Sequence, residues 1–226
     1  MGKRVLARDV ASFEEFHQAV EAFGHAVVIY RGQKSLDWPL QPKIGRYARL
    51  RSHETLREER ATLKIFKERA VPHLNFTPIN DWDWLALGQH HGLPTRLLDW
   101  SRNPLVSAYF AVEEEHDGDS AVYGYRSNTA IDTAEHPDPF VRPTVDRFLP
   151  RHVSPRIIAQ NGVFTSHPDV KVDLRTIPAV VRITIKHEFR RSLKAMLYKY
   201  GIHRASLFPD LDGLSKHIEW LRTNVF

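Results

Sequence analysis

The residues best suited to chemistry are concentrated in one string, WDWLALGQHHGLPTRLLDWSRNPLVSAYFAVE, at positions 82–113. It contains the tandem histidines His90 and His91 and, beyond a Gly-Leu-Pro turn, Arg96 and Asp99. Imidazole and carboxylate groups act as general acids and bases, and a guanidinium can bind a phosphate through two hydrogen bonds. We therefore expect this string to form one side of a functional site.

The histidine pair favours a contact or acid–base role over a metal site. Neighbouring residues on a helix point about 100° apart, so both rings would not face one ion without further ligands such as Asp99 or His73. The spacing matches neither HExxH nor His-x3–5-His, and a chain with no cysteine has no thiolate ligands. We predict no metal site.

A structural role for the same side chains is the alternative. Gln89, His90, Arg96 and Asp99 could form a buried hydrogen-bonded network at the junction of a helix and a strand, with Arg96 paired to Asp99. The string has no GxSxG, Walker A or GxGxxG motif, which disfavours a hydrolase triad, a P-loop and a Rossmann site. A network of this kind is compatible with a site beside it.

A second candidate lies at the end of the run AVVIYRG, residues 26–32, which predicts a buried strand. Arg31 at the end of this strand must reach solvent or a partner, because an unpaired buried guanidinium is costly. Gly32 allows a turn or the close approach of a ligand. A strand-end arginine in a salt bridge is the structural alternative.

Composition limits the function classes. The chain has 226 residues, 42% of them hydrophobic, which is enough for the core of one large domain. It lacks a long apolar run and a signal sequence, so we expect a cytoplasmic protein without membrane partners. A net charge of +5 favours anionic partners such as nucleic acid, nucleotides or an acidic protein. Without cysteine, covalent chemistry requires other nucleophiles.

The elements that would position these residues give an α+β domain. Helical spacing predicts helices over 13–23, within 46–70, over 82–91 and after Pro104, and a strand or extended segment over 95–101. Trp38 is expected to cover an edge of the core. Further predictions are strands at 120–127 and 179–187, a hairpin with an Asn-Gly turn over 156–168, a helix over 188–200, a short strand near 205–208 and a terminal helix.

Two strings resemble the FRG domain family, which is named for its Phe/Tyr-Arg-Gly motif. They are IYRGQ at 29–33 with WPL at 38–40, and QHHGLPTRLLDW at 89–100 followed by NPL and YFA; residues 156–164 and 207–214 are similar as well. The resemblance implies a single FRG domain over 1–226, with 1–24 as an N-terminal helix packed on it. It also implies a bacterial or phage-associated toxin or defence protein, with a cognate antitoxin or immunity protein as partner.

A looser resemblance is to the ADP-ribosyltransferase pattern of Arg-Gly, then Ser-Thr-Ser, then an Ala-x-x-Phe helix. It implies a split, mostly antiparallel sheet around a cleft that takes NAD as substrate. Arg31 would hold the phosphates or ribose, Thr95 and Ser101 would support the nicotinamide pocket, and Trp100 or Tyr109 would stack on nicotinamide. The expected cofactor-binding residues are Tyr30, Arg31, Gly32, Thr95, Arg96, Trp100, Ser101 and Tyr109.

The third transferase motif, a glutamate on a later strand, has no counterpart in the matching register at 156–162. Gln160, Glu188 or Glu219 would have to replace it, or His90, His91 or Asp99 would take over its role. The expected catalytic residues are therefore His90, His91, Asp99 and Gln160. The implied activity is ADP-ribosyl transfer to a nucleic-acid or protein acceptor, or NAD hydrolysis.

A nucleic-acid-binding or nucleic-acid-cleaving module without NAD chemistry is the alternative function. Its basis is a basic face on the helix at 188–200, beside other cations, that would contact phosphates without reading sequence. A solvated helix face is the structural explanation of the same pattern. Phe189, Leu193, Met196, Leu197 and Tyr200 are expected to point inward, and Arg190, Arg191, Lys194 and Lys199 outward, near Arg182, Lys186 and Arg204.

Overall fold

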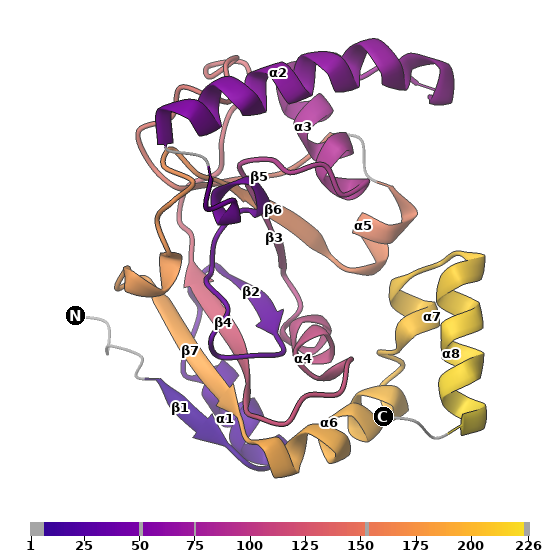
Figure 1. Ribbon diagram of the computed structural model, residues 1–226. Coiled ribbons are helices and arrows are strands. Elements are labelled where there is room, and N and C mark those ends of the chain that lie inside the picture. The colour runs from indigo at the N-terminus through magenta and orange to yellow at the C-terminus, as the bar shows by residue number, and fades with distance from the viewer. Residues whose placement is uncertain (1–6, 50–51, 75, 152–153, 224–226) are drawn as a thin grey trace.

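The computed structural model describes residues 7–49, 52–74, 76–151 and 154–223 and shows one open sheet of seven strands flanked by helices (Figure 1). The strand order is β1-β7-β4-β2-β3-β6-β5, with β1 parallel to β7 and the other neighbours antiparallel. The α+β class and the mostly antiparallel sheet are confirmed. The strands are β1 (Arg8–Val10), β2 (Val28–Gln33), β3 (Leu97–Ser101), β4 (Ser120–Arg126), β5 (Asp146–Phe148), β6 (Gly162–Ser166) and β7 (Val180–Ile185).

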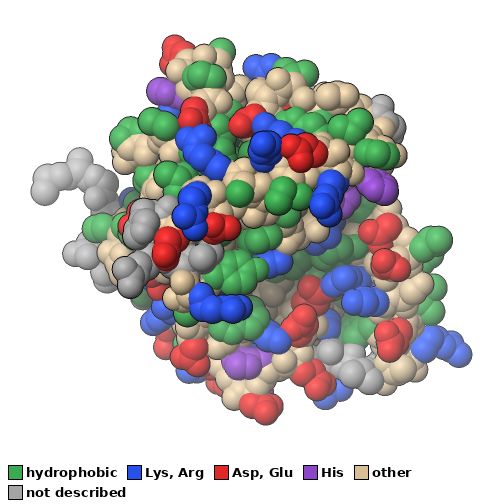
Figure 2. All heavy atoms as spheres, turned by 45° about the horizontal axis from the view of Figure 1, so that its top comes forward, with side chains coloured by type: hydrophobic (Ala, Val, Ile, Leu, Met, Phe, Trp, Pro, Cys, Tyr) green, Lys and Arg blue, Asp and Glu red, His purple; other side chains and the backbone are tan. Residues whose placement is uncertain are grey.

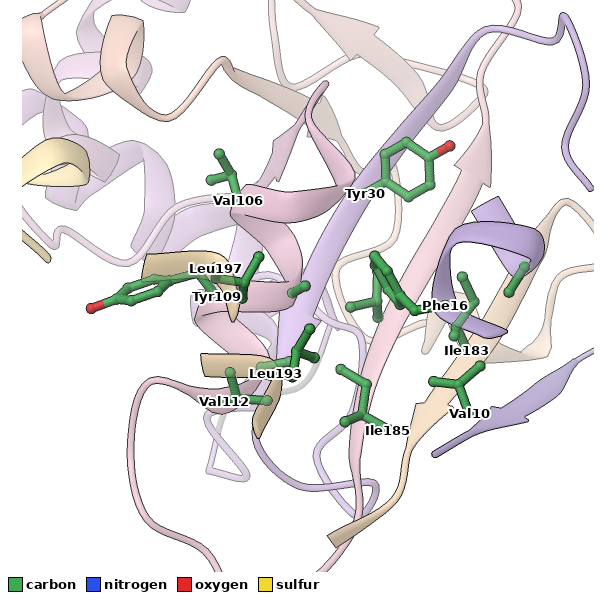
Figure 3. Close-up of a cluster of buried hydrophobic side chains, with 14 of the residues drawn as sticks. Val10, Phe16, Tyr30, Val106, Tyr109, Val112, Ile183, Ile185, Leu193 and Leu197 are labelled. Atoms are coloured by element: carbon green, nitrogen blue, oxygen red, sulfur yellow. The ribbon is translucent and has the colours of Figure 1, made fainter. Parts of the chain in front are cut away.

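The sheet divides between β2 and β3 into two halves, and each half is covered by its own helices. The helices α1, α4 and α6 pack against the β4 and β7 half, where they form the buried cluster drawn in Figure 3. The helices α2 and α3 pack over the β3, β6 and β5 half. The helices are α1 (Phe13–Glu21), α2 (Ser52–Ala70), α3 (Asp81–His90), α4 (Pro104–Val112), α5 (Pro155–Ala159), α6 (His187–Lys199), α7 (Arg204–Leu207) and α8 (Leu211–Thr223), with short 3-10 turns at Lys43–Arg46, Val71–His73 and Leu174–Thr176.

The division between the two halves is a near-separation of two strands. β2 pairs with β4 at six positions, and β3 pairs with β6 at five. β2 and β3 meet at a single register pair, Tyr30 and Ser101. The ends of β2 and β3 that extend past this pair are therefore free to form the two sides of a cleft.

Caps fix the helices that border this division. Asn80 caps α3 by accepting a hydrogen bond from the Asp83 amide, and Gly92, with φ of 84°, ends the helix. Asn103 caps α4 and Pro104 occupies its first turn. The predicted end of α3 at the Gly-Leu-Pro turn and the predicted start of α4 at Pro104 are confirmed. No helix in the described ranges is both long enough and apolar enough to cross a bilayer.

Three predicted elements are corrected. The first half of the hairpin over 156–168 is a helix, α5, whose N-cap is Ser154; Asn161, with φ of 48°, then turns the chain into β6. The Asn-Gly pair thus marks a helix end. The strand near 205–208 is helix α7, capped by His203. In the described part of 1–24, strand β1 precedes α1, so this segment is not only a helix.

Two basic residues of α6 point inward, contrary to the prediction. Arg190 is 2% exposed and donates to the carbonyls of Ala111 and Glu114, and Lys194 is 8% exposed and donates to the Glu113 carbonyl. These carbonyls lie at the C-terminal end of α4, where the partial negative charge of the helix dipole attracts cations. Two aromatic side chains expected to be covered are largely exposed, Trp38 by 45% and Tyr200 by 57%, although the Tyr200 ring stacks on Phe13 at 5.4 Å.

Gly32 brings α4 onto β2. A Cβ atom at this position would lie 1.9 Å from the Ser107 carbonyl oxygen, so an alanine cannot be accepted without movement of the helix. We expect Gly32→Ala to lower the free energy of unfolding by at least about 1–3 kcal/mol, the usual cost of overpacking. Gly118→Ala is the control, because its Cβ would meet only the His116 side chain. Equal urea midpoints for the two variants would contradict this role.

Candidate functional site

A cavity of about 590 Å³ lies at the division between β2 and β3, a size typical of small-molecule sites. It brings together predicted residues from segments far apart in the sequence and adds others that were not predicted. The predicted residues that line it are Tyr30, Arg31, Gly32, His90, His91, Asp99, Trp100, Ser101 and Gln160; the added ones include Gln89, Ser107, Phe110, Arg156, Ile157 and Phe164.

Arg31 spans the cleft from β2 to β3. Its Nη1 donates to the Asp99 carbonyl at 2.6 Å and lies 3.7 Å from the Asp99 carboxylate. Burial lowers the pKa of Arg31, and the Asp99 charge opposes this, so the group remains a cation. Its Nε is buried and has no hydrogen-bond partner among the described residues. Arg31 therefore has one donor atom for which a ligand could provide an acceptor.

The Asp99 carboxylate is held by a short chain of hydrogen bonds. Gln89 Nε2 donates to Asp99 Oδ2 at 2.8 Å, and Thr95 Oγ1 donates to Gln89 Oε1 at 2.8 Å. Thr95 is fully buried, so it orients the amide without reaching the cavity. The Asp99 side chain itself is 53% exposed and faces the cavity. The site thus presents an oriented carboxylate to any ligand.

The two histidines end α3 at the edge of the cavity. Their ring centroids are 4.9 Å apart and the planes are nearly perpendicular. Burial lowers the pKa of His90, and the nearby His91 and Arg156 lower it further. His90 is therefore neutral near pH 7 and can accept a proton. No cluster of three metal-binding side chains occurs in the described part of the chain.

Helix α5 also borders the cavity and supplies a second guanidinium. Arg156 lies 4.4 Å from the ring of Phe208, and burial lowers its pKa while Asp99 opposes the shift. The Gln160 side chain donates from Nε2 to the Leu207 carbonyl. The backbone carbonyl of Gln160 accepts a hydrogen bond from the Ser101 hydroxyl at 2.7 Å. The Gln160 amide therefore ties α5 to α7.

Comparison with known proteins bears on this geometry. Residues 26–120 match the FRG domain. The matched region holds β2, α3, β3 and α4, and with them Arg31, His90 and Asp99, whereas Arg156 and Gln160 lie outside it. No curated protein and no solved structure matches the chain.

Two aromatic residues of the FRG region were expected to stack on a ligand, and both rings point elsewhere. Trp100 borders the cavity, but successive strand residues face opposite sides, so its ring is turned away from Asp99; it is 4% exposed and donates from Nε1 to Thr165 Oγ1. Tyr109 lies in the buried cluster drawn in Figure 3, and its ring points away from Tyr30. Its hydroxyl is 3.3 Å from the Glu113 carboxylate. Phe110 is the α4 ring at the cavity.

Arg96 of the FRG region is a structural residue, not part of the cavity. It is 2% exposed and pairs with Glu59 of α2 at 2.9 Å, while its backbone amide donates to the same carboxylate. The predicted pair of Arg96 with Asp99 is wrong. Residues three apart in extended chain point to opposite faces, and only Asp99 faces the cleft.

His167, directly after β6, is expected to make the stability of the protein depend on pH in the acid range. Burial lowers its pKa from 6.5 to about 3, with help from the charges of Arg96 and Arg31. Since the unfolded chain binds this proton below about pH 6.5 and the folded chain does not, stability is full above that pH and falls as pH decreases toward 3.

We expect the free energy of unfolding to fall by more than about 1 kcal/mol per pH unit from this one proton. Urea unfolding between about pH 6 and 4.5 measures it, above the range in which most carboxylates titrate. His167→Gln removes the titrating group, so its slope should be shallower than that of the wild type. An unchanged slope would show that His167 is not the source.

Proposed function

We propose that the cavity binds NAD, cleaves the bond between its ribose and nicotinamide, and passes ADP-ribose to water or an acceptor. The observation that best supports this is the Asp99 carboxylate, oriented by Gln89 and set beside Arg31 in a cavity that Arg156 also lines. NAD is a glycoside that carries phosphates. A site that cleaves it needs cations to bind the phosphates and a carboxylate to stabilise the positive charge that develops on the ribose. We also propose that the fold is of the ADP-ribosyltransferase kind.

Phosphate binding is supported by the two guanidiniums. Arg31 comes from β2 and Arg156 from the start of α5, and both line the cavity. A pyrophosphate between them would accept hydrogen bonds from both, and the buried Nε of Arg31 would gain a partner. Ser107 and Phe110 of α4 border the same space and are available to the ribose and the ring systems.

The chemistry follows from the charges. When the glycosidic bond breaks, its electron pair goes to the pyridinium nitrogen, which leaves as neutral nicotinamide, and positive charge develops on the ribose. A fixed carboxylate stabilises that charge, as in glycoside hydrolysis. Water or an acceptor hydroxyl then bonds to the ribose carbon and gives its proton to neutral His90. In this scheme Asp99 does the work of the missing glutamate.

The biological role that we propose is that of a toxin or defence effector acting in the cytoplasm, with a nucleic-acid or protein acceptor and a cognate antitoxin or immunity protein. Its support is the FRG match. The chemistry above needs only NAD and an acceptor. The biological proposal is therefore separable from the catalytic one.

A nucleic-acid module without NAD chemistry receives less support. Four of the seven cations on which it rested are engaged within the protein: Arg190 and Lys194 are buried, Lys186 pairs with Asp119 at 2.6 Å, and Arg204 pairs with Glu113. The other three, Arg182, Arg191 and Lys199, are exposed. Over the face drawn in Figure 2, basic side chains are interspersed with acidic ones. Neither observation favours a phosphate-tracking surface.

Nicotinamide release from NAD, followed by liquid chromatography with water, protein and nucleic-acid acceptors, tests the proposal. Arg31→Gln should lower release by at least about tenfold, the value of one charged hydrogen bond. Arg57→Gln is the matched control, because the Arg57 side chain is 77% exposed on α2. Absence of release by the wild type with every acceptor would contradict the proposed function.

A further inference from the structure

The last helix, α8, has an apolar face that no described part of the chain covers. Four large aliphatic side chains lie on it and are 42–79% exposed: Leu211 (79%), Leu214 (45%), Ile218 (50%) and Leu221 (42%). They are three, four and three residues apart. This is the spacing of the a and d positions of a coiled coil, which bury such residues against another helix.

A neighbouring face of α8 packs on the rest of the protein and leaves this stripe exposed. Gly213 lies so close to α7 that a Cβ atom would be 2.0 Å from the Phe208 carbonyl oxygen. His217 is 7% exposed and stacks on His203 at 4.2 Å, and Trp220 packs on Tyr198 at 5.4 Å. Figure 1 places α8 at the rim of the molecule, beside α7. The stripe is therefore held at the surface by a packed inner side.

We propose that this stripe is a dimer interface, in which α8 packs antiparallel against α8 of a second copy of the chain. The four positions are symmetrical about residue 216. An antiparallel second copy therefore places Leu211 against Leu221 of that copy, and Leu214 against its Ile218. Every aliphatic side chain meets another one, which is the self-complementarity that a two-fold interface requires.

The charges beside the stripe favour the antiparallel arrangement. Asp210 and Asp212 lie at the start of α8, and Arg222 lies in its last turn. Antiparallel packing sets the acidic end of one helix beside the basic end of the other and opposes the two helix dipoles. Parallel packing would set the two acidic helix starts side by side and align the two dipoles, which is unfavourable.

The same charges argue for a protein helix over a lipid surface as the occupant. Helices that lie on membranes carry an excess of Lys and Arg on their polar face. In α8 the acids Asp212 and Glu219 balance the bases Lys216 and Arg222. A neutral flank gives no attraction to anionic lipid, whereas it suits a helix that meets its own copy.

The dimer should be weak. A helix of 13 residues is about 20 Å long, so a contact between two such helices is smaller than the roughly 1,200–2,000 Å² of a standard interface. We expect a dissociation constant on the order of 10–100 μM. The concentration range of the experiment must extend above this value.

Sedimentation velocity of the whole chain, at concentrations from about 5 to 500 μM, tests the proposal. The wild type should shift from monomer to dimer, and Ile218→Glu should remain monomeric over the range. Ile79→Glu is the matched control: Ile79 is 67% exposed but lies just before α3, so the dimer should persist. A monomeric wild type at 500 μM, or a dimer that survives Ile218→Glu, overturns the proposal.

Because the chain contains no cysteine, disulfide trapping can test the orientation. Leu214→Cys and Ile218→Cys are mixed, one carrying a tag so that the three cross-linked products differ in size. Random pairing already gives twice as much mixed product as either homodimer, so antiparallel packing predicts a mixed product that exceeds the two homodimers together. A mixed product that does not exceed the two homodimers together would overturn the antiparallel arrangement. Neither experiment depends on NAD, so failure here is separate from failure of the proposed function.

Discussion

Replacing Glu59 with Gln is expected to lower the free energy of unfolding by about 3–5 kcal/mol, the cost of breaking a buried ion pair by removing one charge. The Glu59 carboxylate is 1% exposed and the Arg96 guanidinium 3%. Burial raises the pKa of Glu59, and the charge and hydrogen bonds of Arg96 oppose that rise. With Gln at 59, the guanidinium would stay buried with only carbonyl partners.

A neighbouring ion pair supplies the control for this experiment. Arg60 and Asp138 are paired at 2.9 Å, but both side chains are more than 40% exposed, and such pairs contribute less than about 1 kcal/mol. Asp138→Asn makes the same change from carboxylate to amide and keeps an acceptor for the Phe140 amide. Urea unfolding with equal losses in the two variants would contradict a special role for the buried pair.

Asp99→Asn is expected to slow nicotinamide release by about 10²–10³-fold, the usual effect of losing one group that stabilises transition-state charge. The amide keeps the size of the side chain and can still accept the hydrogen bond from Gln89. Since the charge acts mainly on the ribose cation, NAD affinity should change by no more than a few-fold. Release rates at saturating NAD measure the effect.

The matched control is Asp37→Asn, an exposed aspartate outside the cavity, which should leave the rate within about twofold. His90→Gln separates the roles within the site. It should slow transfer to an acceptor through loss of the proton acceptor, by about 10²-fold or more. A rate for Asp99→Asn within threefold of the wild type would remove Asp99 from the mechanism.

The elements around the cleft were predictable because their signals are local. The buried run ending at Gly32, the Pro104 start of α4 and the Gly92 end of α3 each lie within a few residues of the element they define. Strand alternation also bears on one expectation. Asp99 and Trp100 are adjacent on β3, so their side chains point to opposite faces of the sheet although both residues border the cavity.

The remaining site features depend on tertiary contacts. The partner of Arg96 is Glu59, which lies 37 positions earlier, and no local pattern selects it over Asp99. The inward turn of Arg190 follows from the carbonyls at the end of α4, which a hydrophobic pattern on α6 does not reveal. Arg156 enters the cavity only because residues 155–159 form a helix in place of the predicted strand.

Calorimetric titration of NAD into the protein, with Arg31→Gln and Arg156→Gln as variants, tests the central claim most directly. If the pyrophosphate lies between the two guanidiniums, the wild type binds NAD saturably and each variant loses about 10–100-fold in affinity, while Arg57→Gln binds as the wild type does. No detectable binding by the wild type, or equal affinity in all four proteins, would contradict the assignment of this cavity as an NAD site.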